Sequence, residues 1–316
     1  MNQLNQTILI TGGTGFAGSH LVEALLVKGY SRIHVTSYGS DPGFISKLLP
    51  ADNIHALNLT DFEETKAMLA TIQPHQIYHL ASLAGVESSF NKLKTVLEIN
   101  TNLQLSLLLA VKEVCPTARV ITIGSALEYL PQTRPLKETD ELGPVSPYGV
   151  SKVTQDMLAF AFFKQDKLQI IRTRSFNHIG ERQAPGFVVS DFIQAIIEIE
   201  NKQESILKVG NLSAVRDFTD VKDTVQAYIL LMNNGIPGEV YNVGSGTGYE
   251  IQKILDILVG QAQTTINIQP DTSKMRPIDV PQVIANIDKI KLLGWKPTIS
   301  INETLKRTLE YYRNHI

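Results

Sequence analysis

The feature that most constrains this chain is a glycine-rich turn between a short apolar strand and an amphipathic helix. The strand is expected at residues 7–11, and the helix continues through Lys28. Between them, Gly12, Gly15 and Gly18 follow a G-x-x-G-x-x-G spacing. Glycines let the backbone turn tightly and approach a pyrophosphate, whose charge then lies at the N-terminus of the helix. A plain glycine-rich turn is the alternative, but the flanking strand and helix favour dinucleotide binding.

Strands and helices continue to alternate through the first half of the chain. This alternation predicts an α/β fold with a Rossmann-type doubly wound parallel sheet, in which ligands bind at the C-terminal ends of the strands. The expected strands lie at residues 33–36, 54–58, 76–81, 119–123 and 169–173. The expected helices lie at residues 61–72, in a long segment ending near 114, and from 147 onward.

Composition argues against several kinds of partner. The chain has 316 residues, of which 43% are hydrophobic, and this is enough for about two domains' worth of core. Its net charge of −2 offers no basic field for nucleic acid, and no apolar run reaches transmembrane length. The single cysteine, Cys115, cannot form an intrachain disulfide, and the polar start lacks a signal sequence. We therefore expect a cytoplasmic protein without a nucleic-acid partner, a membrane partner or a metal.

A tyrosine and a lysine four residues apart, Tyr148 and Lys152, stand at the start of the helix expected from Pro147. Ser146 is a good N-cap, Pro147 is a good first-turn residue, and residues four apart share one helix face. A free phenol titrates near about 10, and a nearby cation favours the phenolate. We therefore expect Lys152 to lower the pKa of Tyr148 and make it a usable acid or base. The alternative is that both side chains lie on a solvated helix face.

Three motifs together give the chain a resemblance to a known family. The glycine turn, the Tyr148–Lys152 pair and Ser125 at the end of the fifth strand occur in the order and spacing of extended short-chain dehydrogenases/reductases. The resemblance implies that Ser125, Tyr148 and Lys152 form the catalytic triad and that a nicotinamide cofactor is bound. The implied cofactor site consists of Gly12, Gly15, Phe16, Gly18, Ser37, Asn58, Leu59, Leu80, Ala81, Ser82, Tyr148 and Lys152.

The choice between NADP and NAD depends on the end of the second strand. The NAD signature is an acidic residue there, which binds the ribose hydroxyls. Residues 36–40 contain no acid to oppose a 2′-phosphate, and the hydroxyls of Ser37 and Ser40 can hydrogen-bond one. No arginine stands at the usual place, so NADP(H) is favoured only modestly and NAD(H) is the alternative. Asn58 replaces the aspartate that the family usually has near the adenine, and it can still hydrogen-bond the base.

The second half of the chain resembles sugar-nucleotide enzymes of the same family. Residues 176–180 read F-N-H-I-G, and residues 209–221 read V-G-N-L-S-A-V-R-D-F-T-D-V. These motifs closely resemble GDP-6-deoxy-D-mannose reductases and more loosely resemble GDP-mannose 4,6-dehydratases, and the resemblance runs from Thr7 to Pro297. It implies a GDP-linked sugar as substrate, bound by Ser125, Asn177, Arg216, Arg276 and Asp279.

Arginines suit this assignment, because a guanidinium binds phosphate oxygens in a planar, bidentate way. Two surface ion pairs are the alternative, Arg216 with Asp217 and Arg276 with Asp279. We expect His178 to be a packed residue behind its neighbour in the motif rather than a catalytic base.

The chain is expected to form two lobes and a dimer. We expect a dinucleotide-binding domain at residues 1–176 plus about 216–246, and a sugar-nucleotide lobe at about 177–215 and 247–316. The segment G-S-G-T-G at residues 244–248 imitates a phosphate loop, and we interpret it as a turn between the lobes. The helices near residues 95–114 and 147–164 carry more apolar surface than one sheet face needs. A homodimer through a four-helix bundle is therefore expected, as in the family.

Reductases, 4,6-dehydratases and 4-epimerases of this family share the site and differ in what else touches the sugar. The related dehydratases place a glutamate two residues after the catalytic serine or threonine, where it takes the C5 proton. Here that position is Leu127, which cannot take a proton. Glu128 is one residue further, so on an extended segment it points to the opposite face unless a bulge corrects it.

A reduction needs only a hydride, Tyr148 as proton donor and Ser125 to polarise the C4 carbonyl. The sequence therefore favours an NAD(P)H-dependent reductase that converts GDP-4-keto-6-deoxy-D-mannose to GDP-D-rhamnose. A dehydratase and a 4-epimerase are the alternatives, since Ala126 after the serine is typical of epimerases. A non-catalytic dinucleotide sensor is disfavoured, because such proteins typically lose the tyrosine or the lysine.

Overall fold

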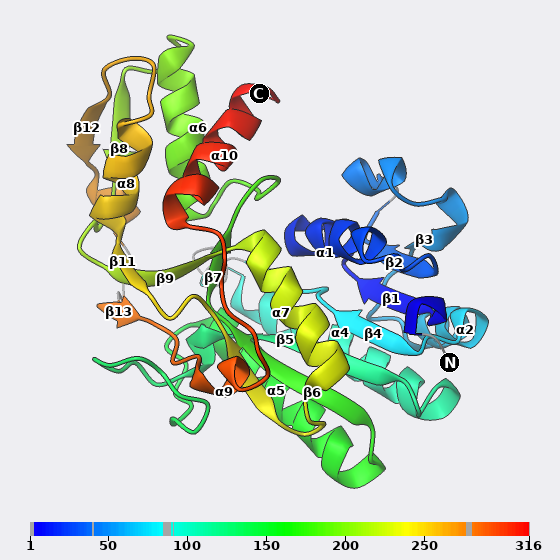
Figure 1. Cartoon of the computed structure of the whole chain (residues 1–316). Coiled ribbons are helices and arrows are strands. Elements are labelled where there is room, and N and C mark those ends of the chain that lie inside the picture. The colour runs from blue at the N-terminus through cyan, green and yellow to red at the C-terminus, as the bar shows by residue number, and fades with distance from the viewer. Residues whose placement is uncertain (1–2, 40, 85–89, 91, 276–279, 316) are drawn as a thin grey trace.

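The computed structural model describes residues 3–39, 41–84, 90, 92–275 and 280–315. Its centre is a seven-stranded parallel sheet with the strand order β10-β6-β5-β4-β1-β2-β3 (Figure 1). This confirms the predicted doubly wound sheet, including the late strand that returns beside β6. The strands are β1 (Ile8–Thr11), β2 (Ile33–Ser37), β3 (Ile54–Ala56), β4 (Gln76–His79), β5 (Arg119–Ser125), β6 (Gln169–Ser175) and β10 (Val240–Val243).

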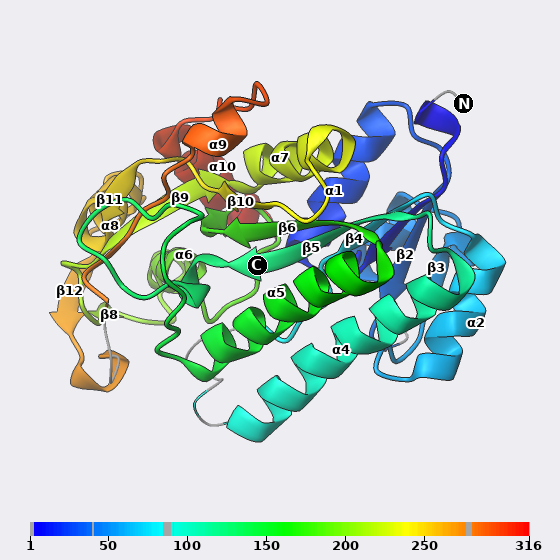
Figure 2. The same ribbon diagram turned by 90° about the horizontal axis from the view of Figure 1, so that it is seen from below.

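Helices cover both faces of this sheet, as Figure 2 shows. Successive side chains of a strand point to opposite faces, so Ile8 and Ile10 pack with one helix layer while Leu9 packs with the other. The first layer contains α1 (Phe16–Val27) and α7 (Val221–Asn234). The second contains α2 (Phe62–Ile72), α4 (Leu93–Val114) and α5 (Pro147–Asp166). Both faces are buried, so β1 is buried along its whole length and apolar from Ile8 to Ile10, which is typical of a parallel sheet.

A smaller group of elements has its own apolar core, which includes Phe192, Ile196, Leu255 and Leu309. Its strands form a four-stranded and a two-stranded sheet, and three helices, α6, α8 and α10, pack around the core. The boundaries of the two predicted lobes remain a prediction. The elements are β7 (Asn177–Ile179), α6 (Val188–Glu200), β8 (Ile206–Val209), β9 (Val215–Asp220), β11 (Gly248–Glu250), α8 (Ile251–Val259), β12 (Asn267–Pro270), β13 (Gln282–Val283) and α10 (Ile301–Arg313). The short helix α9 (Asp288–Lys291) follows β13 but buries Ile290 in the core of the large sheet.

Several strand ends differ from the predicted ones by a few residues. β4 ends at His79 rather than at residue 81, because the backbone N–H groups of Leu80 and Ala81 turn toward Thr11 of β1. β5 and β6 run two residues further than predicted, since their parallel pairing continues to Ser125 opposite Ser175. The longer β5 brings Ser125 to the end of its strand, where the site lies. None of the helices in the described part of the chain has the length and apolarity needed to cross a membrane.

Candidate functional site

The glycine turn joins β1 to α1 in a shape that only small residues allow. Gly12 has a positive φ of 68°, and a Cβ atom there would lie 3.0 Å from the backbone of Ala81. A Cβ on Gly18 would overlap the Gly12 carbonyl oxygen, so α1 packs directly on the turn. The N-cap residue, Gly15, offers no side-chain oxygen to the first turn of α1. The turn therefore fits a pyrophosphate, which can approach the backbone closely and accept from the N-terminal N–H groups of the helix.

The ends of β1 and β4 meet beside this turn through side-chain hydrogen bonds. The Thr11 hydroxyl accepts from Ala81 N at 3.2 Å and lies 2.8 Å from His79 Nδ1. Burial and the charge of Lys152 lower the pKa of His79 to about 3, so its ring is neutral. These contacts fix the segment 80–82, three residues that the sequence assigns to the cofactor site. No motif predicts Thr11 or His79, since their pairing depends on two strands 68 residues apart.

The ends of β2 and β3 hold the residues expected near the adenosine. Ser37 ends β2 and donates its hydroxyl hydrogen to Gly39 O at 3.3 Å. Asn58 follows β3, and its Oδ1 accepts from the backbone N–H and the hydroxyl of Thr60, while Leu59 between them is buried. The parallel sheet thus brings Ser37 and Asn58 to the edge that carries the glycine turn. Ser40, the other hydroxyl considered for a 2′-phosphate, lies outside the described residues.

Ser125 is held in a tight turn at the end of β5. Its Oγ accepts from Leu127 N at 3.2 Å, and its own N–H donates to Glu128 Oε1 at 2.6 Å, so the two side chains cap the turn reciprocally. A Cβ on Gly124 would overlap Glu128 Oε1, so the carboxylate reaches this amide because residue 124 is glycine. Glu128 is therefore turned back toward the protein interior, where it is fully buried.

Tyr148 and Lys152 lie in the first turns of α5, as predicted. The Ser146 hydroxyl caps the helix by accepting from Gly149 N at 3.1 Å. Lys152 Nζ donates to Ile123 O of β5 at 2.9 Å and lies 5.7 Å from the centre of the Tyr148 ring. The structure thus brings the serine turn, the phenol and the ammonium together between β5 and α5.

The expected effect of Lys152 on Tyr148 is wrong for this structure. Burial raises the pKa of Tyr148, and the neighbouring Glu128 and Tyr228 raise it further. Burial lowers the pKa of Lys152 to about 8, although Glu128 opposes this shift. The loss of water around both groups is the larger effect here, and it outweighs the charge of the lysine that alone would lower the tyrosine pKa. The phenol consequently keeps its proton at neutral pH and is suited to act as a proton donor.

Asn100 of α4 is a further residue at this site that no sequence motif singles out. It is fully buried, and its amide nitrogen donates to Ser151 Oγ of α5 at 3.0 Å. Its Oδ1 accepts from Leu83 N at 2.7 Å and from Ser82 Oγ at 3.2 Å. One amide side chain therefore ties the cofactor-side loop to the helix that carries Tyr148.

Two of the residues expected to bind the substrate, Asn177 and Arg216, lie in the four-stranded sheet. Asn177 is exposed on β7, which pairs with β9, and Arg216 is half-buried on β9. The structure therefore brings these two into one sheet. Arg276 and Asp279 lie outside the described residues. His178 is a packed residue, as predicted, but it stacks on Phe16 at 5.7 Å, and burial lowers its pKa.

The second glycine-rich segment is a turn, as interpreted from the sequence, and a carboxylate occupies it. Asp217 of β9 is buried, and it accepts from Ser245 N at 2.7 Å, Gly246 N at 2.9 Å and Ala285 N at 3.1 Å. These partners belong to the turn and to the chain near β13 rather than to a surface ion pair. Because backbone donors of this turn already bind a protein carboxylate, the segment is not a phosphate loop.

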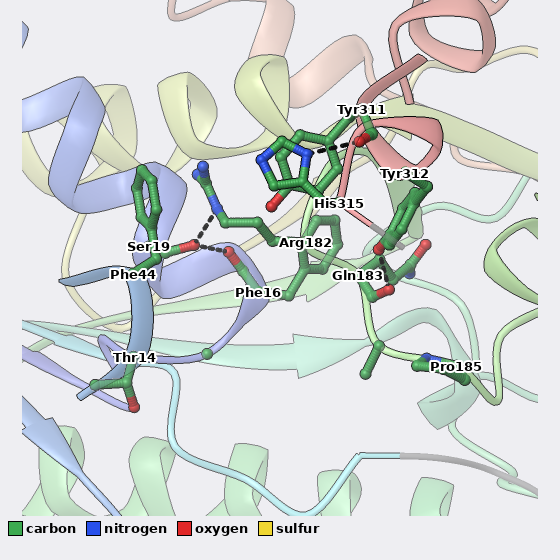
Figure 3. Close-up of a pocket in the computed structure, with 12 residues that line it drawn as sticks. Thr14, Phe16, Ser19, Phe44, Arg182, Gln183, Pro185, Tyr311, Tyr312 and His315 are labelled. Carbon is green, nitrogen blue, oxygen red and sulfur yellow. Dashed lines mark hydrogen bonds between the residues drawn. The ribbon is translucent and has the colours of Figure 1, made fainter. Parts of the chain in front are cut away.

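A cavity of about 400 Å³ opens beside the first turn of α1 (Figure 3). Arg182 crosses it, donating to Ser19 Oγ at 2.9 Å, pairing with Glu23 and stacking on Phe44 at 4.1 Å. The end of α10 forms the opposite wall, where the Tyr312 hydroxyl donates to Gln183 O. The cavity adjoins the glycine turn, while Ser125, Tyr148 and Lys152 lie elsewhere. Its lining residues are Thr14, Gly15, Phe16, Ser19, Phe44, Arg182, Gln183, Ala184, Pro185, Tyr311, Tyr312 and His315.

Known proteins align with nearly the whole length of this chain. Residues 9–308 match the family model described as GDP-mannose 4,6 dehydratase. GDP-6-deoxy-D-mannose reductase of Pseudomonas aeruginosa is 28% identical over 318 residues, which cover 99% of each chain. A solved structure of RMD from Pseudomonas aeruginosa complexed with NADPH has a TM-score of 0.84 and 27% identity, covering 99% of this chain and 100% of that one. UDP-glucose 4-epimerase of Thermotoga maritima, solved with UDP-glucose, has a TM-score of 0.86 and 29% identity, covering 98% of this chain and 99% of that one.

The close approach of α5 to the serine turn yields a first prediction. A Cβ on Gly149 would overlap the Leu127 carbonyl oxygen and lie 2.9 Å from Pro144 Cβ, so Gly149→Ala must push α5 away from the turn. Overpacking of this kind typically costs about 1–3 kcal/mol, so we expect a lower melting temperature by calorimetry. The control is Gly260→Ala, which has helical dihedrals and leaves 3.2 Å to Asp256 O. Equal melting temperatures for the two variants would show that the contact at Gly149 is not tight.

Proposed function

The chain belongs to the GDP-mannose 4,6 dehydratase family of extended short-chain dehydrogenases/reductases, and from that premise we propose that it is an NAD(P)H-dependent sugar-nucleotide reductase. The relatives support the wider class, an enzyme of the dehydrogenase/reductase type that acts on nucleotide sugars. The substrate that we propose is GDP-4-keto-6-deoxy-D-mannose, and the product is GDP-D-rhamnose. This choice rests on the 28% identity to a GDP-6-deoxy-D-mannose reductase and on the residues around Ser125.

The observation that carries the choice of reduction over elimination is the orientation of Glu128. Leu127 stands two residues after Ser125, and its side chain cannot take a proton from C5 of a sugar. The Glu128 carboxylate accepts from Ser125 N at 2.6 Å and from Arg174 Nε at 2.9 Å, and it is fully buried. A backbone bulge after Ser125 could turn Glu128 toward a substrate, but it would break these two hydrogen bonds and is therefore not favoured. Neither Leu127 nor the inward-turned Glu128 offers a base to C5, which suits a simple reduction.

In the proposed reaction, two hydroxyls of this chain act on the C4 oxygen of the sugar. When bound, the nicotinamide cofactor supplies the hydride to C4. Negative charge then develops on the C4 oxygen, and the Ser125 and Tyr148 hydroxyls donate hydrogen bonds to it. Tyr148 gives up its proton to that oxygen, which agrees with a half-buried phenol whose raised pKa keeps it protonated at neutral pH. The Lys152 ammonium lies beside the phenol and stabilises the phenolate that remains.

In this proposal, residues of the four-stranded sheet bind the substrate diphosphate. Arg216 offers a planar guanidinium for bidentate contact with phosphate oxygens, and Asn177 offers an exposed amide on the neighbouring strand. The family resemblance adds Arg276 and Asp279 to this set.

The cytoplasmic location expected from the single cysteine also remains a prediction.

We propose NADPH as the preferred cofactor, held by the glycine turn and by the ends of β2, β3 and β4. The solved relative bound to NADPH supports this, as does the absence of a carboxylate at residues 36–39. Titration of the apo protein with both cofactors should therefore give a dissociation constant for NADPH no higher than that for NADH. A clear preference for NADH would mean that the end of β2 binds ribose hydroxyls instead of a phosphate.

The reaction is tested by the loss of NADPH absorbance with keto sugar freshly made from GDP-mannose by a dehydratase. Tyr148→Phe should keep binding but lower turnover by about a hundredfold or more, the scale for loss of a general acid. Arg216→Ala should instead raise KM with little change in kcat, because it binds phosphate in the ground state and the transition state alike. Tyr30→Phe, which alters a buried tyrosine beyond the end of α1, is the control and should behave as wild type.

Two outcomes would replace this proposal. If NADPH stays constant while GDP-mannose itself is dehydrated, the protein is a dehydratase and Glu128 must turn toward the substrate. If a nucleotide sugar is converted to its C4 epimer with no net oxidation of NADPH, the protein is an epimerase, as the Ala126 position and the Thermotoga relative allow. Absence of turnover with every sugar nucleotide would leave a dinucleotide sensor.

We also propose a homodimer formed by α4 and α5 of two copies. The two helices lie side by side on one face of the sheet (Figure 2), and exposed apolar side chains of α5 include Val150, Met157 and Phe160. Light scattering at micromolar concentration should give the mass of a dimer, and Met157→Glu should shift it toward the monomer. Leu292→Glu, at an exposed leucine beside α9, is the matched control and should leave the mass unchanged. A monomeric wild type would contradict the proposal.

A further inference from the structure

Four charged side chains form one buried chain of ion pairs between β5, α5 and β6. Arg174 of β6 donates from Nε to Glu128 Oε2 at 2.9 Å and from Nη2 to Asp156 Oδ2 at 2.7 Å. Arg172, two residues earlier on the same strand, donates from Nη1 to Asp156 Oδ1 at 2.9 Å. None of the four side chains is more than 10% exposed. We call these residues the buried ion network: Glu128, Asp156, Arg172 and Arg174.

The two carboxyl groups of this network stand on the segments that carry the residues of the proposed reaction. At one end, Glu128 accepts the backbone N–H of Ser125 with the oxygen that Arg174 does not use. Asp156, which accepts from both arginines, stands on α5 four residues after Lys152, one turn further along the helix that carries Tyr148. Arg174 is the only member of the network that contacts both carboxylates. The serine turn and the tyrosine helix are thereby joined through one guanidinium.

Arg174 is itself held in place. Its guanidinium carbon lies 4.8 Å from the centre of the Tyr129 ring, and the Tyr129 hydroxyl donates to Asn242 Oδ1 at 2.7 Å. A planar guanidinium with fixed donor directions sets the positions of its partners more strictly than a flexible ammonium does. The network therefore transmits a defined geometry from β6 to the serine turn and to α5.

Stability alone does not account for this arrangement. Burial and the neighbouring Asp156 raise the pKa of Glu128 to about 8, although the Arg174 guanidinium and the Ser125 amide oppose that rise. Charged groups lose water on burial, and well-packed apolar residues are often as stable or more stable in their place. A buried network of two guanidinium groups and two carboxyl groups is instead suited to fixing one arrangement of the elements that it joins.

We propose that Arg174 is a positioning residue, which fixes the Ser125 hydroxyl relative to the Tyr148 hydroxyl by clamping Glu128 and Asp156. The inference rests on the proposed reduction, because it assumes that both hydroxyls donate to one carbonyl oxygen. Donors that must converge on one oxygen need a fixed separation, and a misplacement of about 1 Å can cost on the order of a hundredfold in rate.

The test compares two arginines of the same network. Arg174→Met removes the link between the two carboxylates, whereas Arg172→Met removes an ion pair to Asp156 but leaves Glu128 and Arg174 paired. We expect both variants to melt at lower temperature than wild type. Only Arg174→Met should lower kcat strongly, by about a hundredfold, while KM and the affinity for NADPH stay close to wild type. Equal kcat for the two variants would overturn the proposal.

A double-mutant cycle separates positioning from general damage. If Arg174 acts through Ser125, then Arg174→Met should cost less than about threefold in kcat when Ser125→Ala is already present. The same hundredfold loss in both backgrounds would show that Arg174 does not act through the serine. If Arg174→Met only reduced the fraction of folded protein, kcat would fall by the same factor with and without Ser125→Ala. The expected result, a much smaller factor in the Ser125→Ala background, therefore cannot come from unfolding alone.

A crystal structure of Arg174→Met gives a readout that does not depend on the reaction. We expect the turn at residues 125–128 to move relative to α5, and we expect no such movement in Arg172→Met. If wild type turns over no sugar nucleotide but the turn moves as expected, the proposed function fails and the clamp stands. If Ser125 keeps its position in Arg174→Met, the clamp fails whatever the reaction is.

Discussion

The parallel pairing of β1, β4, β5 and β6 is the constraint on which the rest of this structure depends. It brings the C-terminal ends of strands far apart in the sequence to one edge, where Thr11, His79 and Ser125 lie. The site is then completed by close backbone contacts at glycines of the first turn and of α5, which leave no room for a Cβ. The chemistry of this protein therefore depends as much on where side chains are absent as on where they are present.

Much of this arrangement follows from local sequence. The alternation of strands and helices predicts the sheet, and the Ser146–Pro147 pair predicts the start of α5, because both signals act over a few residues. The glycine spacing likewise predicts the turn before α1. The ends of β4 and β5 are less predictable, since they depend on hydrogen bonds to Thr11 and on the register with β6, which no local pattern encodes.

The electrostatics of the site could not be predicted in the same way. The spacing of Tyr148 and Lys152 correctly predicts that both lie on one face of a helix. The direction in which the tyrosine pKa shifts, however, depends on burial by elements distant in the sequence. Arg174 lies 46 residues from Glu128, and only the fold shows that they pair. Asn100 is similar, because a buried asparagine within an amphipathic helix carries no sequence signal for its partners on two other segments.

The burial of Lys152 has a consequence for folding. Its pKa falls from the usual 10.5 of a lysine to about 8 in the folded chain, so between these two values the unfolded chain holds a proton that the folded chain has released. Stability therefore increases with pH across this window, and near neutrality the fold carries a charged amine that water would solvate better. The lysine that stabilises the phenolate in the proposed reaction thus lowers the stability of the protein that positions it.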